Sequence, residues 1–599
     1  MYDLTFALRT LMAALSFAGY SVFLTRRWHI HPLIAPAVVI PALGTVMVIS
    51  GILNIMLLMV YLLCGLGLAL LVYTLIVNKG TKGLLHPAHL VVLAAFFWLL
   101  WRLQGAQVHS VDNFHHWLRV LKVLLANDEL PSYRTPMITF QAYPTGSASY
   151  LYYMLRLIGY REDLAIIAQL MMLVVFCLPL FALPKKGKWL AWVALAGFLA
   201  VALSQLYERD TLLVDDLQAF IGISAIAIAY YYRADLFKAL LCLTPTAIFT
   251  VFIKNSAFYF IAMTTLFLMV VLQDKQQRGR LKIVFFNFIL PSLVFYLWTR
   301  HVAQVFNSGL GYGMEAKHAL NLSSYYDQAK SWGISRIPEL LGRVFEQAFG
   351  TMYFPGLLAL LSTLAALLLT VPLWISGKTR EAIRSLLLLG FAWLGYVLWE
   401  AGIVGMFAVS MPYGETDMLA CAERYMMTGL VYMFGLMVLS AVESVNSWPD
   451  MSKAAPRAAA VALALACAYV PVHFSGFPGQ WGAPLRHIAA RNYFAQLQEK
   501  HTFPFGVNII YVTDQGNQYY QLNKYMMTDF LAESAFPMST ADAETLADVA
   551  QAAAEYAADY DILLIDTQND EVLDGLADAM DKGAFYHMRV FLDLDEVLQ

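Results

Sequence analysis

The residues best suited to chemistry lie in the segment 107–119, QVHSVDNFHHWLR, which directly follows the apolar stretch 90–103. An acidic residue at such a junction sits at a membrane surface, where a lipid-borne and a water-borne substrate can meet. Asp112 is therefore the leading candidate for a general base that takes a proton from a hydroxyl group. His115, His116 and Arg119 follow at i+3, i+4 and i+7, which predicts one common face if the segment is helical. We expect the imidazoles to tune the Asp112 pKa or to bind substrate.

Two other interpretations of this segment stay open. Asp112 and the two histidines are ligand types for a divalent cation, although His115 and His116 would point about 100° apart on a helix. The segment is also compatible with a solvated loop that has a capping Asp and interfacial aromatic rings.

An acidic cluster precedes a later apolar stretch, in the sequence 207–220, YERDTLLVDDLQAF. Such carboxylates can bind sugar hydroxyl groups, or a cation together with its phosphate. Asp215 and Asp216 lie closest to the following helix and are the preferred candidates. The alternative is that acidic residues merely mark a loop outside the cytoplasm.

Three cations stand at the predicted ends of apolar stretches. They are Lys254, Arg300 and Arg424, the last beside Tyr425. A Lys or Arg in such a position can hold a phosphate group and stabilise it as a leaving group. The alternative for Lys254 and Arg300 is that the side chain extends to the interface without contacting substrate.

The composition indicates that membrane helices must position these residues. Of the 599 residues, 60% are hydrophobic and 14% are charged, and the mean hydropathy is +0.60. A soluble globular protein does not carry such a composition. Since a span needs roughly 20 apolar residues, the pattern predicts about 13 or 14 transmembrane helices. We place them at 4–24, 33–50, 54–77, 88–104, 163–183, 189–206, 217–232, 239–253, 256–272, 283–299, 351–376, 385–408, 424–446 and 457–473.

The predicted membrane domain covers residues 1–474. Lys and Arg concentrate in alternate short loops, which predicts that those loops are cytoplasmic. The opposite set of loops carries the candidate residues, at 105–162, 207–216, 300–350 and 410–423.

Residues 475–599 form a predicted soluble α/β domain outside the cytoplasm. NIIYVT and YDILLID are typical of buried strands, LADVAQAAAEYA is typical of a helix, and HMRVFLDL closes the chain. The loop QGNQYYQLNKY, residues 515–525, carries no catalytic signature.

Five short motifs, taken in order, resemble those of the C-type (GT-C) integral-membrane glycosyltransferases. They are Asp112 in the first large loop, Tyr143-Pro144-Thr145-Gly146, the acidic segment LVDDL at 213–217, Lys254-Asn255-Ser256-Ala257, and Arg424-Tyr425. The family's tyrosine-proline turn often has a second proline where this chain has Thr145. No motif is specific alone, so the resemblance depends on their order, sidedness and spacing over the membrane domain.

This resemblance implies a GT-C-like fold and an inverting transfer of sugar from a polyprenyl-phosphate donor to a glycan or lipid-linked acceptor. Asp112 would act as general base, and Lys254, Arg300 and Arg424 would stabilise the departing phosphate. The remaining candidates for substrate binding are His115, His116, Tyr143, Asp215, Asp216 and Tyr425. Members of this fold occur with and without a divalent cation, so Mg²⁺ or Mn²⁺ is a possible cofactor, with Asp112, Asp215 and Asp216 as candidate ligands. Membrane lipids are expected partners and nucleic acid is not.

The expected location is a bacterial plasma membrane, with the active site facing the cell envelope. Other functions stay open: a polymerase or ligase of surface polysaccharide, a transporter or flippase of lipid-linked sugars, or a non-catalytic assembly subunit. A transporter should show charged residues in mid-span and inverted repeats. We expect instead that the charges gather at the outer ends of the helices.

Overall fold

The structure of this chain is a computed structural model. It describes residues 3–78, 86–108, 111–132, 138, 140–204, 206, 211–272, 277–306, 326, 330, 333–350, 354–448, 488–503, 506–514, 522, 525–526, 534–540 and 546–597.

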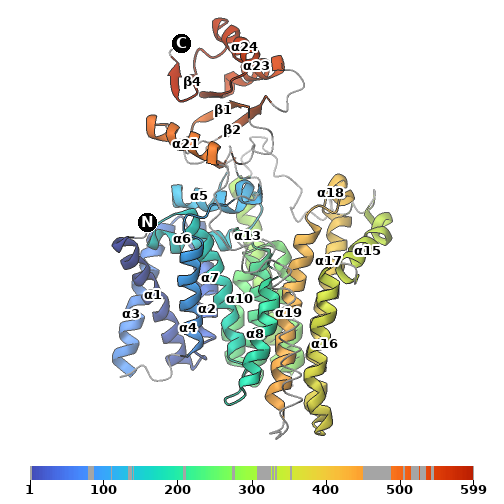
Figure 1. The fold of residues 1–599 in the computed structure, drawn as a ribbon. Coiled ribbons are helices and arrows are strands. Elements are labelled where there is room, and N and C mark those ends of the chain that lie inside the picture. Colours follow the sequence, from blue (N-terminus) through green and yellow to red (C-terminus); the bar gives the residue numbers. More distant parts are fainter. Residues whose placement is uncertain are drawn as a thin grey trace.

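Long apolar helices make up most of the described chain, as expected for a multi-pass helical membrane protein. Eight segments are long and apolar enough to cross a membrane. They comprise α1 (Leu4–Trp28), α2 (Ala35–Ile52), α3 (Met56–Asn78), α7 (Glu162–Phe181), the run of α12 (Gln277–Val284), η3 (Phe285–Ile289) and α13 (Leu290–Phe306), α16 (Phe354–Ile375), α17 (Thr379–Val409) and α19 (Ala422–Ser447). They stand side by side beneath the C-terminal domain (Figure 1).

The other predicted spans are shorter helices. They are α4 (Ala88–Arg102), α8 (Trp189–Ser204), α9 (Asp215–Tyr231), α10 (Leu236–Val251) and α11 (Phe258–Val271). The structure thus has a helix at each of the first 13 predicted spans, but by length and hydropathy it supports eight full spans among the described residues rather than 13 or 14. The predicted span 457–473 lies outside the described residues.

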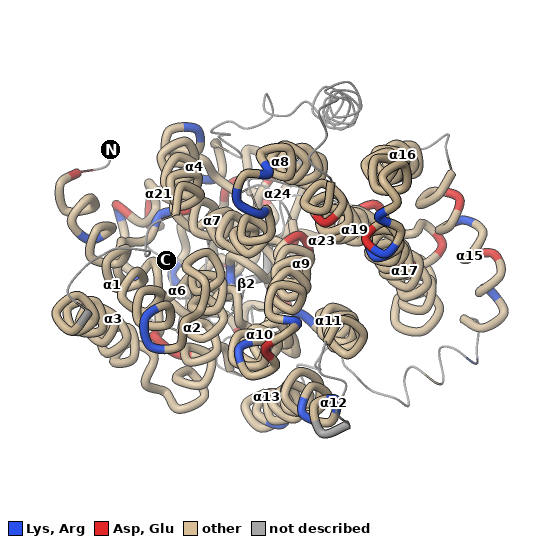
Figure 2. Tube along the Cα trace, turned by 90° about the horizontal axis from the view of Figure 1, so that it is seen from below, with Lys and Arg blue, Asp and Glu red and all other residues tan. Residues whose placement is uncertain are grey.

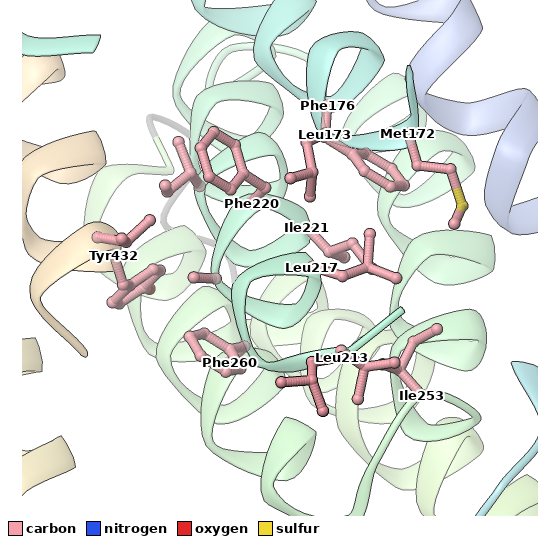
Figure 3. Packing of buried hydrophobic residues seen from close by; sticks show 14 of the residues in the cluster. Met172, Leu173, Phe176, Leu213, Leu217, Phe220, Ile221, Ile253, Phe260 and Tyr432 are labelled. Atoms are coloured by element: carbon pink, nitrogen blue, oxygen red, sulfur yellow. The ribbon is translucent and has the colours of Figure 1, made fainter. Parts of the chain in front are cut away.

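Helix α9 lies at the centre of this bundle, and this explains why it is apolar on all sides. Its side chains pack against α7, α10, α11 and α19. Figure 3 shows Phe220 and Ile221 of α9 among Phe176, Phe260 and Tyr432 from three neighbouring helices. A helix surrounded by protein has no polar face to present to solvent. Its first residue is therefore held on a rigid support.

Shorter elements connect the spans at the end of the bundle that faces the C-terminal domain. The first large loop, between α4 and α7, contains a π-helix, η1 (Asn113–Trp117), followed by α5 (Leu118–Asn127) and α6 (Gly146–Ile158). The others are the 3₁₀ turn η2 (Asn255–Ala257), α15 (Ile334–Phe349) and α18 (Tyr413–Asp417). Helix α5 packs on α6, and its side chains 118–124, including Arg119, are buried in protein. Its surface is therefore covered largely by protein.

Basic residues occupy the opposite end of the bundle. Arg26 and Arg27 lie in the last turn of α1. The Lys188 ammonium donates to the Trp448 carbonyl oxygen over 3.1 Å, and the Lys378 ammonium donates to that of Ser447 over 2.9 Å, both at the carboxyl end of α19. Figure 2, seen from this end, shows Lys and Arg on several helix termini. Cations suit this place because the last carbonyl groups of a helix carry partial negative charge.

The C-terminal domain is built on a five-stranded sheet in the order β2-β1-β3-β4-β5. The strands are β1 (Asn508–Thr513), β2 (Ser534–Ser539), β3 (Ile562–Asp566), β4 (Arg589–Leu592) and β5 (Asp595–Val597). The first four are parallel and β5 is antiparallel to β4. The predicted small α/β fold and the strands NIIYVT and YDILLID are confirmed.

Helices cover both faces of this sheet. Ile510 and Val512 of β1 pack with residues of α23 (Leu546–Tyr556) and α24 (Asp570–Asp581). Ile509 and Tyr511 face the other side, where α21 (Ile488–Lys500) lies. Alternate side chains of a strand point to opposite faces, so a strand that is apolar throughout must be covered on both.

Candidate functional site

Four charged side chains from four separate segments meet at the end of the bundle beneath the C-terminal domain. The Arg424 guanidinium donates a hydrogen bond to the Asp112 carboxylate, and its Nε lies 3.5 Å from Asp215 Oδ2. The Lys254 ammonium donates to Asp215 Oδ1 over 2.8 Å. Two carboxylates and two cations balance one another, and this permits them to be buried together.

The four side chains differ in their access to solvent. The exposed fraction is 30% for the Asp112 side chain but 5% for Asp215. Those of Lys254 and Arg424 are 11% and 10% exposed. Asp112 is therefore the carboxylate that a substrate can reach, whereas Asp215 is enclosed by the two cations.

Helix ends explain part of this arrangement. Asp215 is the first residue of α9, where a carboxylate is favoured by the helix dipole. Arg424 is in the first turn of α19, where the dipole disfavours a cation. The contacts of Arg424 with Asp112 and Asp215 offset that cost.

Asn113 ties the Asp112 segment to the start of α9. Its Nδ2 donates to Thr211 Oγ1 over 2.8 Å, and its Oδ1 accepts from the Leu212 backbone N–H over 3.0 Å. Asn113 is fully buried, so both bonds are shielded from water. These two hydrogen bonds of the uncharged Asn113 side chain hold the Asp112 segment beside the start of α9, although Asp112 and Asp215 lie about a hundred residues apart in the chain.

The turn Tyr143–Gly146 packs against the segment that carries Lys254. The Gly146 backbone N–H donates to the Phe252 carbonyl oxygen over 2.7 Å. A Cβ at position 146 would lie 2.6 Å from that same oxygen, so the contact requires glycine.

Burial alone would lower the pKa of the Lys254 ammonium, but Asp215 and Tyr425 outweigh it and raise that pKa above its usual range. Lys254 is thus held as a cation.

Two tyrosines border the charged cluster. The Tyr425 ring centroid is 5.1 Å from Lys254 Nζ. Burial, and then the charges of Tyr425, Asp215 and Asp112, raise the pKa of the Tyr143 hydroxyl well above its usual range. The Tyr143 ring is therefore neutral, and both rings lie close to the cluster, as suits groups that contact a sugar or a lipid phosphate.

The two histidines lie beside an aromatic cluster. The His116 ring is 5.3 Å from that of Tyr143 and 5.7 Å from that of Phe140. Burial, followed by the charge of Arg119, lowers the His116 pKa to about 3, so this imidazole is neutral. The His115 ring is 6.1 Å from Phe140. The predicted spacing assumed an α-helix, whereas residues 113–117 form the π-helix η1, and a common face for 112, 115, 116 and 119 remains a prediction.

The remaining sequence candidates are placed as follows. Asp216 is half-buried next to Asp215 in α9. Arg300 is exposed on α13, and among the residues that the structure describes it makes no contact with the charged cluster. A role for either residue remains a prediction.

Three polar features were missed by sequence reasoning. Asn113 is one, and the hydrogen bond of 2.7 Å from Ser256 Oγ to Gln218 Oε1, which links η2 to α9, is another. The third is Glu400, which lies within α17 and is fully buried. Neither of its carboxylate oxygens has a hydrogen-bond partner within the described part of the chain. The expectation that charges gather at the outer ends of the helices is therefore wrong for Glu400, which lies inside the predicted span 385–408.

The candidate metal ligands Asp112 and Asp215 face cations in this structure. Among the described residues, no group of three or more His, Cys, Asp or Glu side chains is placed to hold a metal ion.

The fold and site define a multi-pass helical membrane protein with a buried charged cluster beneath a small α/β domain. Comparison of the chain with protein-family models, with curated proteins and with solved structures finds no match.

Proposed function

We propose that this protein is a membrane glycosyltransferase of the GT-C type. It would transfer a sugar, with inversion, from a polyprenyl-phosphate donor to a glycan or lipid-linked acceptor. The observation that carries the proposal is the meeting of Asp112, Asp215, Lys254 and Arg424 at one end of the helical bundle. This places a solvent-accessible carboxylate beside Arg424, with Lys254 on the adjoining carboxylate, and so combines a base with cations for a phosphate leaving group.

In the proposed reaction the Asp112 carboxylate accepts the proton of an acceptor hydroxyl group. The hydroxyl oxygen bonds to the anomeric carbon of the donor sugar. The bond from that carbon to the phosphate oxygen breaks, and polyprenyl phosphate leaves with the electron pair. Lys254 and Arg424 stabilise the negative charge on the departing phosphate.

The contact between Arg424 and Asp112 adds a step to this scheme. While the Arg424 guanidinium donates to the Asp112 carboxylate, one carboxylate oxygen is occupied and is not free to accept the proton of an acceptor hydroxyl. A donor phosphate would compete with Asp112 for Arg424, and this exchange would free the carboxylate for the acceptor hydroxyl. Donor binding would thus precede activation of the acceptor.

The distribution of basic residues supports a sidedness for the site. Lys188 and Lys378 lie at the end of α19 opposite to Arg424. Lys and Arg concentrate in the cytoplasmic loops of membrane proteins. We therefore place the charged cluster and the C-terminal domain on the extracytoplasmic side, and a bacterial plasma membrane is the proposed location.

The test is transfer of radiolabelled sugar from a panel of polyprenyl-phosphate sugars by the full chain in nanodiscs, with a membrane extract as acceptor. Asp112→Asn should lower the rate about 10²- to 10⁴-fold, the usual contribution of a general base. Asp417→Asn is the matched control, since Asp417 is 58% exposed and pairs with Arg336. Equal rates for wild type and folded Asp112→Asn would remove Asp112 from the mechanism, and adding a chelator tests the metal requirement.

A transporter of lipid-linked sugars is the second candidate, because Glu400 is a buried carboxyl group within a predicted span. Such residues often belong to ion or proton pathways. Flux of a lipid-linked sugar across proteoliposomes that is lost in Glu400→Gln and kept in Asp112→Asn would favour transport over transfer.

A further inference from the structure

Tyr525 belongs to the C-terminal domain but is buried against the membrane domain. It is the last residue of the sequence QGNQYYQLNKY, which falls between β1 and β2 in the chain, and its own backbone is helical. Its exposed fraction is 0%. The C-terminal domain stands above α5 and the first loop (Figure 1), so Tyr525 reaches from one domain into the other.

Contacts with three segments of the membrane domain hold the Tyr525 side chain and backbone. The hydroxyl group donates to Glu162 Oε1 over 2.8 Å. Lys122 Nζ lies 3.7 Å from the ring centroid and 3.4 Å from the Tyr525 carbonyl oxygen. The Phe114 ring centroid is 5.2 Å from that of Tyr525.

Arg491 of α21 completes this interdomain contact. Its guanidinium donates to Glu162 Oε1 over 2.7 Å and to the Val108 carbonyl oxygen over 3.0 Å. Glu162 Oε2 in turn accepts from the Val108 backbone N–H over 3.1 Å. Arg491 is buried, so these charge-assisted bonds are shielded from water and strong.

The two anchor points lie on either side of Asp112. Val108 precedes Asp112 by four residues and is fixed by Glu162 and Arg491. Phe114 follows it by two residues, and its ring packs at a tilt against that of Tyr525. Asp112 itself is the half-buried residue between them. With Val108 and Phe114 held in this way, Asp112 is restrained from both directions along the chain, and its side chain is positioned accordingly.

We propose that Tyr525 and Arg491 are positioning residues, through which the C-terminal domain sets the place of the Asp112 segment in the membrane domain. The C-terminal domain thereby completes the site without contributing a group to the charged cluster. The positional claim stands on the contacts alone, and its consequence for catalysis rests on the proposed glycosyl transfer.

Hydrogen–deuterium exchange of the full chain in nanodiscs tests the positional claim. Tyr525→Ala should speed exchange in the peptide 108–120 about tenfold, since losing the anchor raises the frequency of local opening. Tyr525→Phe keeps the ring beside Phe114 and should give a smaller increase. Tyr586→Ala is the control, because Tyr586 lies on the same domain and is 82% exposed.

A general loss of stability is distinguished by the exchange of α9. If exchange in 215–231 rises as much as in 108–120, Tyr525 supports the whole fold and the proposal is wrong. Unchanged exchange in 108–120 would also overturn it. In the transfer assay, Tyr525→Phe should lower kcat with little change in the KM for the donor. Faster exchange in 108–120 with no transfer by any variant, including wild type, would leave the positioning role intact and remove the proposed function.

Discussion

The ion pair between Lys254 and Asp215 offers the sharpest test of the charged cluster. The change is Lys254→Met, which keeps a long apolar chain and removes the ammonium group. Lys254 is 11% exposed and Asp215 is 5% exposed, so the substitution leaves a buried carboxylate without its partner at 2.8 Å. Breaking a buried pair in this way usually costs about 3–5 kcal/mol. Arg424, with its Nε 3.5 Å from the same carboxylate, compensates in part, so we expect about 3 kcal/mol.

The expected shift in melting temperature is small because the chain is long. An unfolding entropy of about 2 cal/mol/K per residue gives about 1.3 kcal/mol/K for the whole chain. A loss of about 3 kcal/mol therefore lowers Tm by about 2–3 °C if the chain unfolds as one unit. Thermal unfolding of the purified protein in nanodiscs, followed by intrinsic fluorescence, measures this shift.

A double-mutant cycle separates the pair from its two members. Asp215→Asn alone should also destabilise the chain, because it leaves Lys254 and Arg424 facing each other. The combination of Lys254→Met with Asp215→Asn should be less harmful than the sum, with a coupling free energy of about 2–3 kcal/mol. The partly exposed pair Lys238–Asp235, 3.3 Å apart, is the matched control. Its coupling should stay below about 1 kcal/mol.

Additive effects of the two changes would refute the argument, since they would mean that the two side chains do not interact. The pH dependence gives a second check. The Lys254 pKa is raised, so its contribution is fully present below the usual lysine value of about 10.4 and is lost only as the pH rises through the higher folded-state value. The coupling should therefore be constant between pH 7 and 9. Transfer activity should stay low in the double variant, because its restored stability does not restore the cation.

Three further outcomes are expected. Burial lowers the His116 pKa to about 3, so below the ordinary histidine pKa of about 6.5 the unfolded state binds a proton that the folded state does not. The free energy of unfolding should therefore fall by up to about 1.4 kcal/mol for each pH unit below that value. In denaturation measured at pH 4–7, His116→Gln should make the free energy depend less steeply on pH, and an unchanged dependence would refute this. Gly146→Ala places a Cβ 2.6 Å from the Phe252 carbonyl oxygen and should cost about 1–3 kcal/mol in thermal unfolding. Gly342→Ala is the control, because a Cβ there has nothing within 4 Å and should be neutral or stabilising. Equal changes in melting temperature for the two variants would contradict this packing. Asp514 accepts three hydrogen bonds, which lower its pKa against the effect of burial, so it stabilises the fold above about pH 4 and this stabilisation is lost below it. Because the site is exposed, Asp514→Ala should cost only about 1 kcal/mol, seen as faster hydrogen–deuterium exchange in 562–568. Unchanged exchange there would refute a stabilising role for Asp514.

The helices could be predicted from the sequence because their signal is local. A run of apolar residues predicts a membrane helix without knowledge of its neighbours, and each of the first 13 predicted spans coincides with a helix or helical run. Likewise, the alternation of strands and helices after residue 488 gave the α/β fold. Candidate charges at helix ends were found in the same way, since a charge beside an apolar run is visible in the sequence.

The pairing of the site could not be predicted, because it depends on contacts between distant segments. The bond of Asn113 to Thr211 and Leu212 has no local signature. Residues 113–117 form a π-helix, and nothing in their local sequence distinguishes it from the α-helical spacing of 3.6 residues that the prediction assumed. Burial of Tyr525 depends on the packing of two domains, and a polar loop gives no sign of it.

The partners Asp112 and Arg424 are separated by 312 positions along the chain. At a synthesis rate of about 5–20 residues per second, the ribosome adds Arg424 roughly 16–60 s after Asp112. During that time the carboxylate has to remain in water, since burial without a cation is costly. The charged cluster is therefore among the last parts of the membrane domain to assemble. A chain truncated before α19 would insert most of its helices but would lack Arg424. Its Asp112 carboxylate would stay exposed and unpaired, whereas the same carboxylate in the full chain is paired with Arg424.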